Sequence, residues 1–120
     1  MTKVLIADDE PNIVMSLDFL MRKAKYEVFI ARDGQEALDL AQQEQPDLIL
    51  LDIMMPEMNG YEVFEQLKQN PNTQHCKVIF MSAKGKEEDI KKGLALGASL
   101  YVTKPFSTRN LMKQVKQLLK

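Results

Sequence analysis

Acidic side chains follow two apolar runs that lie far apart in the sequence. Asp8, Asp9 and Glu10 come directly after VLIA, and Asp52 comes directly after LILL. Carboxylates that cluster repel one another and take up protons unless a cation lies among them. Hard oxygen ligands of this kind suit Mg²⁺, which uses one or two carboxylates and keeps several waters. If the fold brings these acids together, they predict a magnesium site.

Two further polar groups follow apolar runs near the other end of the chain. Ser82 comes after VIFM, and Lys104 comes after LYVT and precedes Pro105. Each group also has a plain structural reading. An acid before Pro11 is a good helix N-cap, Asp52 could cap a turn, Ser82 could be a strand-end hydroxyl, and Lys104 a solvated lysine. Their joint occurrence at four run ends favours a functional site over four separate coincidences.

The elements that must position these groups follow from the apolar pattern. Five runs too short and too β-branched for helices predict strands at residues 4–7, 28–31, 48–51, 78–81 and 100–102. Between and after them, segments of helical period alternate with the runs, clearest around Val14 and Leu17 and around Leu111 and Val115. The pattern is that of five strand–helix units.

Strands that are apolar throughout, without alternation, are typical of a parallel sheet covered on both faces. We therefore expect an α/β fold, a doubly wound five-stranded sheet, for which 2-1-3-4-5 is one common strand order. Such sheets carry their functional groups beyond the carboxyl ends of the strands, where the strand order reverses. In this order that point lies between the first and third strands, so Asp8, Asp9, Glu10 and Asp52 should converge.

Length and composition are those of one globular domain. The 120 residues, 45% hydrophobic and 28% charged, predict a single domain over 1–120 with no effector domain in this chain. No apolar run reaches the roughly 18 residues of a membrane span, and the early acids do not fit a signal peptide, so we expect no membrane partner and a cytoplasmic location. Cys76 and His75 lack companions for a disulfide or metal site and are interpreted as ordinary loop or surface residues.

Charge is divided unevenly along the chain. The overall net charge of −1 combines 7 Lys/Arg and 14 Asp/Glu in residues 1–83 with 9 Lys/Arg and 3 Asp/Glu in residues 84–120. Within the basic part, a stripe at helical spacing runs through Arg109, Lys113, Lys116 and Lys120. This stripe is either a solvated face or part of a partner surface. It is short and lacks interleaved aromatic residues, so we expect no direct binding of nucleic acid.

Four sequence blocks together resemble one family. The blocks are ADDE (7–10), LLDIMMPEMNGYE (50–62), FMSA (80–83) and YVTKPF (101–106). In composition and spacing they are similar to the receiver domain of bacterial two-component response regulators, with its CheY-like, flavodoxin-like fold. The resemblance covers essentially the whole chain.

The resemblance implies a phosphorylation site with a metal ion. Asp52 would accept a phosphoryl group from a phosphohistidine of a sensor histidine kinase or a phosphotransfer protein. Asp9 and Asp52 would bind Mg²⁺ directly, together with the backbone carbonyl of Met54, and Asp8 would act through a water. The domain would catalyse only its own phosphoryl transfer and dephosphorylation, and would not be an enzyme acting on a separate substrate.

The resemblance also assigns the switch. Lys104 would contact a phosphoryl oxygen, and Ser82 would hydrogen-bond another and shift toward it. Tyr101 would turn inward behind Ser82; its alternative is a strand residue with its hydroxyl in water. The Lys104–Pro105 peptide bond would be cis. Met54 and Lys84 occupy positions that tune dephosphorylation in the family, and neither is the polar residue associated with fast turnover, which suggests a long-lived phosphoryl group.

The last third of the chain resembles receivers of OmpR-like transcription factors. This resemblance implies that residues 84–120 contact a downstream protein or effector domain, and that a phosphorylation-dependent homodimer is a candidate assembly. Relatives of this class carry an acidic pair where this chain has Ser99 and Leu100, and a glutamate where it has Asn110. The ion pairs of that dimer therefore lose partners here.

Three other functions share parts of this pattern. A haloacid-dehalogenase-like phosphatase places its nucleophile after the first strand in a DxD arrangement, where this chain reads Asp8-Asp9-Glu10. A flavodoxin-like FMN carrier needs a phosphate-binding loop there, and these acids would repel phosphate. A receiver-shaped interaction module that is never phosphorylated is the third alternative, and the sequence leaves it open.

Overall fold

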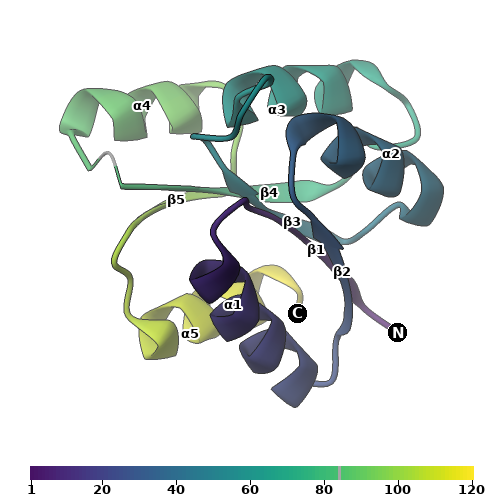
Figure 1. Ribbon diagram of the computed structural model, residues 1–120, viewed down its shortest axis with the longest axis vertical. Coiled ribbons are helices and arrows are strands. Elements are labelled where there is room, and N and C mark those ends of the chain that lie inside the picture. Colours follow the sequence, from purple (N-terminus) through teal and green to yellow (C-terminus); the bar gives the residue numbers. More distant parts are fainter. Residues whose placement is uncertain (84) are drawn as a thin grey trace.

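The computed structural model of this protein describes residues 1–83 and 85–120, over which strands and helices alternate (Figure 1). The strands are β1 (Lys3–Ala7), β2 (Glu27–Ala31), β3 (Leu48–Asp52), β4 (Lys77–Ser82) and β5 (Leu100–Thr103). The helices are α1 (Pro11–Lys23), α2 (Gly34–Glu44), α3 (Gly60–Gln69), α4 (Glu87–Ala95) and α5 (Thr108–Leu118). Every predicted strand run is a strand, longer by one or two residues.

The strands form one parallel sheet in the order β2-β1-β3-β4-β5, which confirms the predicted order. Helices α2, α3 and α4 cover one face of the sheet, and α1 and α5 cover the other (Figure 1). The order reverses between β1 and β3, which are neighbours although β2 separates them in the sequence. The carboxyl ends of these two strands therefore meet at one edge.

Two apolar cores explain why the strands show no alternation of apolar and polar residues. In β3, Ile49 and Leu51 pack into the core under α2 and α3, while Leu48 and Leu50 pack into the core against α1 and α5. Successive side chains point to opposite faces of a strand, and here both faces are buried. A strand such as β3 is consequently apolar at every position until Asp52.

Helix α3 begins directly against the end of β3. Asn59 is its N-cap: the side chain accepts a hydrogen bond from the Glu62 N–H, and Glu62 accepts one from the Asn59 N–H. A β-carbon at Gly60 would lie 2.7 Å from the Asp52 carbonyl oxygen and 2.8 Å from the Ile53 α-carbon. The glycine at the start of α3 thus has a steric reason, because only glycine permits this close approach.

Among the described helices, none combines the length and the apolar character that crossing a bilayer would require.

Candidate functional site

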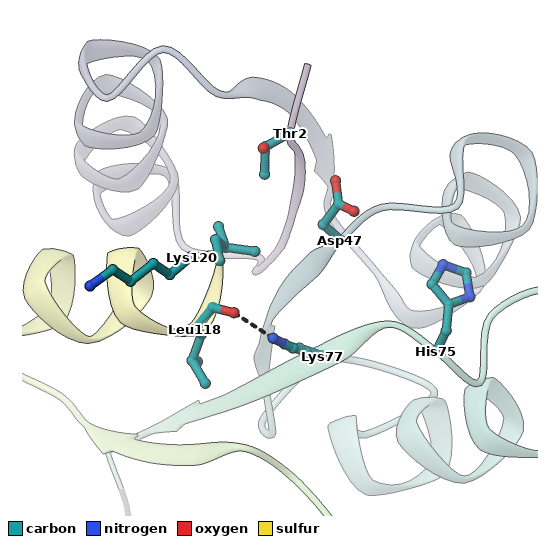
Figure 2. Close-up of a pocket in the computed structure, with 7 residues that line it drawn as sticks. Thr2, Asp47, His75, Lys77, Leu118 and Lys120 are labelled. Carbon is teal, nitrogen blue, oxygen red and sulfur yellow. Dashed lines mark hydrogen bonds between the residues drawn. The ribbon is translucent and has the colours of Figure 1, made fainter.

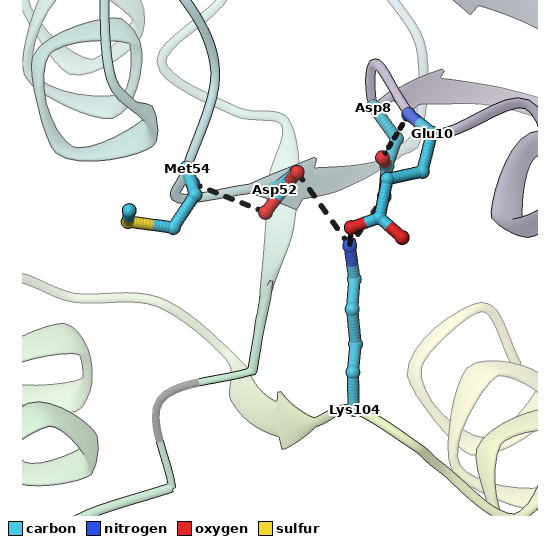
Figure 3. A network of polar contacts seen from close by, with 5 residues as sticks. All are labelled: Asp8, Glu10, Asp52, Met54 and Lys104. Atoms are coloured by element: carbon cyan, nitrogen blue, oxygen red, sulfur yellow. Dashed lines mark hydrogen bonds and ion pairs between the residues drawn. The ribbon is translucent and has the colours of Figure 1, made fainter.

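The polar residues predicted from the strand ends lie at the carboxyl edge of the sheet. Asp52 is the last residue of β3 and Ser82 the last of β4, while Asp8 directly follows β1 and Lys104 directly follows β5. Figure 3 shows the Lys104 side chain reaching toward Asp52 on one side and toward Asp8 and Glu10 on the other. The sheet topology therefore brings together residues from both ends of the chain.

Lys104 is the positive centre of this cluster. Its Nζ donates to Asp8 Oδ2 at 2.9 Å and to Glu10 Oε1 at 3.2 Å, and lies 3.5 Å from Asp52 Oδ2. The side chain is only 8% exposed. Burial lowers the pKa of Lys104, but the hydrogen bond with Asp8 and the charges of Asp52 and Asp8 outweigh that effect and raise it. The amine therefore stays protonated, as a buried cation with acidic partners should.

Asp52 is held in a strongly perturbed environment. It is 2% exposed, and its Oδ1 accepts a hydrogen bond of 3.1 Å from the Met54 N–H. Burial and then the charge of Asp8 raise the pKa of the Asp52 carboxyl to about 6, against the opposing effects of the Met54 hydrogen bond and Lys104. Because burial disfavours the charged form of Asp52, a positive charge placed beside the carboxyl would stabilise that form.

Three carboxylates form a group that fits a divalent cation. Asp8, Glu10 and Asp52 each offer an oxygen, and these oxygens lie within 4.8 Å of one another. One ammonium faces three acids, so the cluster retains a negative charge that a hard cation would neutralise. The donor set thus fits Mg²⁺.

Asp9, predicted from the resemblance as a direct ligand, lies apart from this group. Its side chain is exposed, although its charge still contributes to raising the pKa of Asp52, less than burial and Asp8 do. Its role as a ligand stays a prediction, as does that of the Met54 carbonyl. Met54 is 54% exposed, so its side chain does not fill a gap in the core.

Glu10 contributes more than the sequence indicated. It stands at the N-cap position of α1, but its side chain makes no capping hydrogen bond. Instead it reaches Lys104, while its backbone N–H donates to Asp8 Oδ1 at 2.9 Å. The capping reading of these acids therefore does not hold for the Glu10 side chain. In the sequence, the contact of Glu10 with Lys104 was indicated only by the position of Glu10, two residues after Asp8 at the same strand end.

Comparison with known proteins identifies the family. The response regulator receiver domain family matches residues 4–116. The chain belongs to this family. The alkaline phosphatase synthesis transcriptional regulatory protein PhoP of Bacillus subtilis (strain 168) is 43% identical over 118 residues, which are 98% of this chain and 48% of that protein. The chain thus spans about half the length of this curated relative.

Solved receiver structures agree closely with the fold. The chemotaxis response regulator CheY4 of Vibrio cholerae is 31% identical, with a TM-score of 0.90, and the match covers 98% of each chain. The receiver domain of the Francisella response regulator 1452 is 37% identical, with a TM-score of 0.89, over 98% of this chain and 96% of that one. The CheY-like fold predicted for this receiver domain is confirmed.

The two predicted switch residues of this receiver domain are in contact. Ser82 is fully buried, and its side chain is hydrogen-bonded to that of Tyr101. Burial raises the pKa of the partly buried Tyr101, while the hydrogen bond from Ser82 lowers it. The Tyr101 hydroxyl therefore has protein partners, unlike in the alternative reading of a hydroxyl left to water. The Lys104–Pro105 peptide bond next to the site is cis, and Lys84 lies outside the described residues.

A hollow lies at the opposite edge of the sheet. Figure 2 shows it between Asp47, His75 and Lys77, and the Lys77 ammonium there donates to the carbonyl of Leu118 at the end of α5. His75 is exposed, in keeping with its interpretation as a surface residue. Cys76 lies in the loop before β4 but is 1% exposed, so the surface reading was wrong for it. Its neighbours are the core residues under α2 and α3.

Proposed function

We propose that this receiver domain is a phosphorylation-dependent switch in which Asp52 accepts a phosphoryl group from a phosphohistidine. The donor would be a sensor histidine kinase or a phosphotransfer protein. The observation that carries the proposal is the buried Asp52 carboxylate lying 3.5 Å from the Lys104 ammonium, within a group of acids that fits a divalent cation. Family membership supports it, because receiver domains serve two-component signalling.

The transfer is a substitution at phosphorus. A carboxylate oxygen of Asp52 attacks the phosphorus, a P–O bond forms, and the P–N bond to the histidine breaks. The departing imidazole nitrogen keeps the electron pair and takes a proton. The Met54 N–H, bonded to Oδ1, fixes the orientation of the carboxylate before the attack.

Positive charge is the main contribution of the surrounding residues. Lys104 lies close enough to Asp52 to contact an oxygen of the transferred group, where it acts as a point charge. Of the acid group, Asp52 would bind Mg²⁺ directly and Asp8 through a water, and the family resemblance adds Asp9 and the Met54 carbonyl as direct ligands. When bound, Mg²⁺ supplies further positive charge for the phosphoryl oxygens.

The output is a shift between two conformations. A phosphoryl group adds negative charge at the carboxyl edge, which draws the Ser82 hydroxyl toward it and biases Tyr101. The face formed by α4, β5 and α5 would then bind a downstream protein or an effector domain. Because the Bacillus relative is a transcriptional regulatory protein twice as long, we propose an effector of that kind and a cytoplasmic location. A homodimer through the same face is a second candidate.

The domain would act on itself and not on a separate substrate. Its chemistry would be limited to taking up a phosphoryl group and losing it by hydrolysis. We propose that the phosphoryl group is long-lived, because Met54 does not offer a polar side chain to a hydrolytic water. Decay of the aspartyl phosphate within seconds would contradict this.

The test is intact mass after incubation with Mg²⁺ and acetyl phosphate. Wild type should gain about 80 Da, one phosphoryl group, and Asp52→Asn should gain none. Asp39→Asn is the matched control, because Asp39 is an exposed acid on α2. It should gain the group as wild type does. A gain that survives Asp52→Asn would overturn the assignment of Asp52.

The competing function is an interaction module of the same shape that is never phosphorylated. It would be favoured by no mass gain in wild type with either acetyl phosphate or a phosphorylated histidine kinase.

A further inference from the structure

Helices α3 and α4 are joined by a contact between Tyr61 and Lys92. Lys92 Nζ lies 4.4 Å from the centroid of the Tyr61 ring, well within the range of a cation–π interaction. The same ring stands edge-on to Phe80 of β4, with centroids 5.2 Å apart and an interplanar angle of 70°. Tyr61 therefore contacts both the buried sheet and the exposed side chain of α4.

Tyr101 lies in the same group of rings. Its centroid is 6.5 Å from that of Phe80, at 63°. A β-carbon at Gly93 would lie 2.8 Å from Tyr101 Cδ2 and 3.0 Å from Phe80 Cδ2. Gly93 directly follows Lys92, so the turn of α4 that contacts Tyr61 is also the turn that lies against the Tyr101 ring. The inward orientation of Tyr101 thus depends on where α4 is held.

Hydroxyl groups connect the same residues. The side chains of Tyr61 and Tyr101 are hydrogen-bonded to each other, and Tyr101 is also hydrogen-bonded to Ser82. The Tyr101 hydroxyl therefore has Tyr61 and Ser82 among its partners.

We propose that Tyr61 and Lys92 form a clasp between α3 and α4 that holds Tyr101 inward, which makes Tyr61 a positioning residue for the Ser82–Tyr101 switch. The clasp has two parts. The Lys92 ammonium on the Tyr61 ring fixes α4 above Tyr101, and the Tyr61 hydroxyl is hydrogen-bonded to that of Tyr101.

The second part matters most when the switch is engaged, and here the inference rests on the proposed function. A phosphoryl oxygen on Asp52 would take the hydrogen bond of Ser82, and Tyr101 would lose that partner. Losing a hydrogen-bond partner at a partly buried hydroxyl is costly. The contact with the Tyr61 hydroxyl does not depend on Ser82, so it helps to keep Tyr101 inward in the phosphorylated state.

The first experiment needs no phosphorylation. The chain has three tyrosines, so labelling with 3-fluorotyrosine gives three ¹⁹F resonances, assigned by Tyr→Phe substitution. Whether the Tyr101 resonance is shielded from solvent reports its inward population. Tyr61→Phe keeps the ring but removes the hydroxyl that is hydrogen-bonded to Tyr101, and should shift the inward-to-outward ratio of Tyr101 outward by about fivefold, the factor one net hydrogen bond supplies.

Lysine variants test the ring contact. Lys92→Gln should shift the same ratio outward by about two- to fivefold, as expected for an exposed cation–π pair, and Lys92→Arg should restore the wild-type ratio. Lys91→Gln is the matched control, because it removes the same charge from α4. In wild type the Lys91 ammonium pairs with Glu87 at 3.2 Å. Lys92 is exposed, so its variants should fold as wild type does.

The outcomes separate the clasp from the proposed function. The clasp is overturned if Tyr61→Phe and Lys92→Gln leave the Tyr101 resonance unchanged, or if Lys91→Gln moves it as far as Lys92→Gln does. Mg²⁺ and acetyl phosphate are then added to each protein, with the phosphoryl group followed by mass. Absence of phosphorylation in wild type would count against the proposed function alone, because the unphosphorylated comparison still decides the clasp.

Discussion

The ammonium of Lys104 lies closer to Asp8, at 2.9 Å, than to Asp52, at 3.5 Å. Its strongest contact is therefore with the acid that follows β1, and Asp52 is compensated less. The site keeps a surplus of negative charge around the carboxyl group that is proposed to react. This surplus is the common origin of the next two predictions.

Asp52→Asn should stabilise the protein at neutral pH in the absence of divalent cations. The pKa of the Asp52 carboxyl is about 6 in the folded state against an ordinary value of 3.8, so the folded state penalises the charged form. We expect the free energy of unfolding to rise by about 1–2 kcal/mol, allowing for partial screening by solvent.

The difference in the free energy of unfolding between Asp52→Asn and wild type should depend on pH. The raised folded pKa means that the folded state binds the proton more tightly than the unfolded state. The advantage of Asp52→Asn is therefore full above about pH 6, shrinks as the pH falls and is gone below about pH 4. Urea unfolding in EDTA at several pH values measures it, with Asp39→Asn as the control for an exposed acid. An advantage that grows toward low pH would refute this account.

Lys104→Met should make the fold dependent on a divalent cation. Removing the ammonium leaves Asp8, Glu10 and Asp52 without compensation, and we expect the free energy of unfolding in EDTA to fall by about 2–4 kcal/mol. Mg²⁺ should recover more stability in this variant than it adds to wild type.

Lys3→Met is the matched control for Lys104→Met. Lys3 also pairs with an acid, Glu44 at 3.2 Å, but its side chain is 34% exposed, so its loss should cost no more than about 1 kcal/mol. Equal Mg²⁺ stabilisation of wild type and Lys104→Met in urea unfolding would show that Lys104 does not compensate the acid group.

Gly60→Ala should destabilise the protein much more than Gly85→Ala. At Gly60 the added β-carbon would meet backbone atoms of Asp52 and Ile53 at 2.7 and 2.8 Å, whereas at Gly85 it would meet the methyl end of Thr103 at 3.0 Å. We expect costs of about 2–4 kcal/mol at Gly60 and less than about 1 kcal/mol at Gly85. Urea unfolding of both variants measures these two costs. Similar costs would mean that α3 can move away from β3.

The Cys76 thiol should be unreactive in the folded protein. Burial raises its pKa to about 11, so roughly one thiol in a thousand is ionised at about pH 8, and that one is enclosed by the core. Ellman's reagent should modify Cys76 slowly in buffer and at once in urea. Stoichiometric modification of the native protein within seconds would contradict its burial.

The strands were predictable because their signal is local, and their order was expected as one common order of doubly wound sheets. Runs such as LILL are apolar at every position, which requires two covered faces and thus a parallel sheet with helices on both sides. The start of α3 also matches a local signal, because Asn59 is a residue type that favours the N-cap position. Strand ends were placed within one or two residues, since pairing with neighbours extends a strand slightly past its apolar run.

The contacts within the site were less predictable. The sequence placed Asp8, Asp9 and Glu10 after one strand but gave no means to tell which side chains turn toward Asp52. Cys76 had no sequence feature that separated a buried loop residue from a surface one.

By itself, the sequence determined the fold class and the strand ends at which acids, a hydroxyl and an ammonium stand. Periodicity and residue type suffice for these, because backbone hydrogen bonding and burial act on every residue of an element. The strand order was expected as one common order of such sheets, and the tertiary structure fixed it. Only the tertiary structure decided that Asp8 and Glu10 pair with Lys104, and that Tyr61 meets Lys92. Those contacts depend on side-chain directions just beyond the elements and on how neighbouring helices such as α3 and α4 pack against each other.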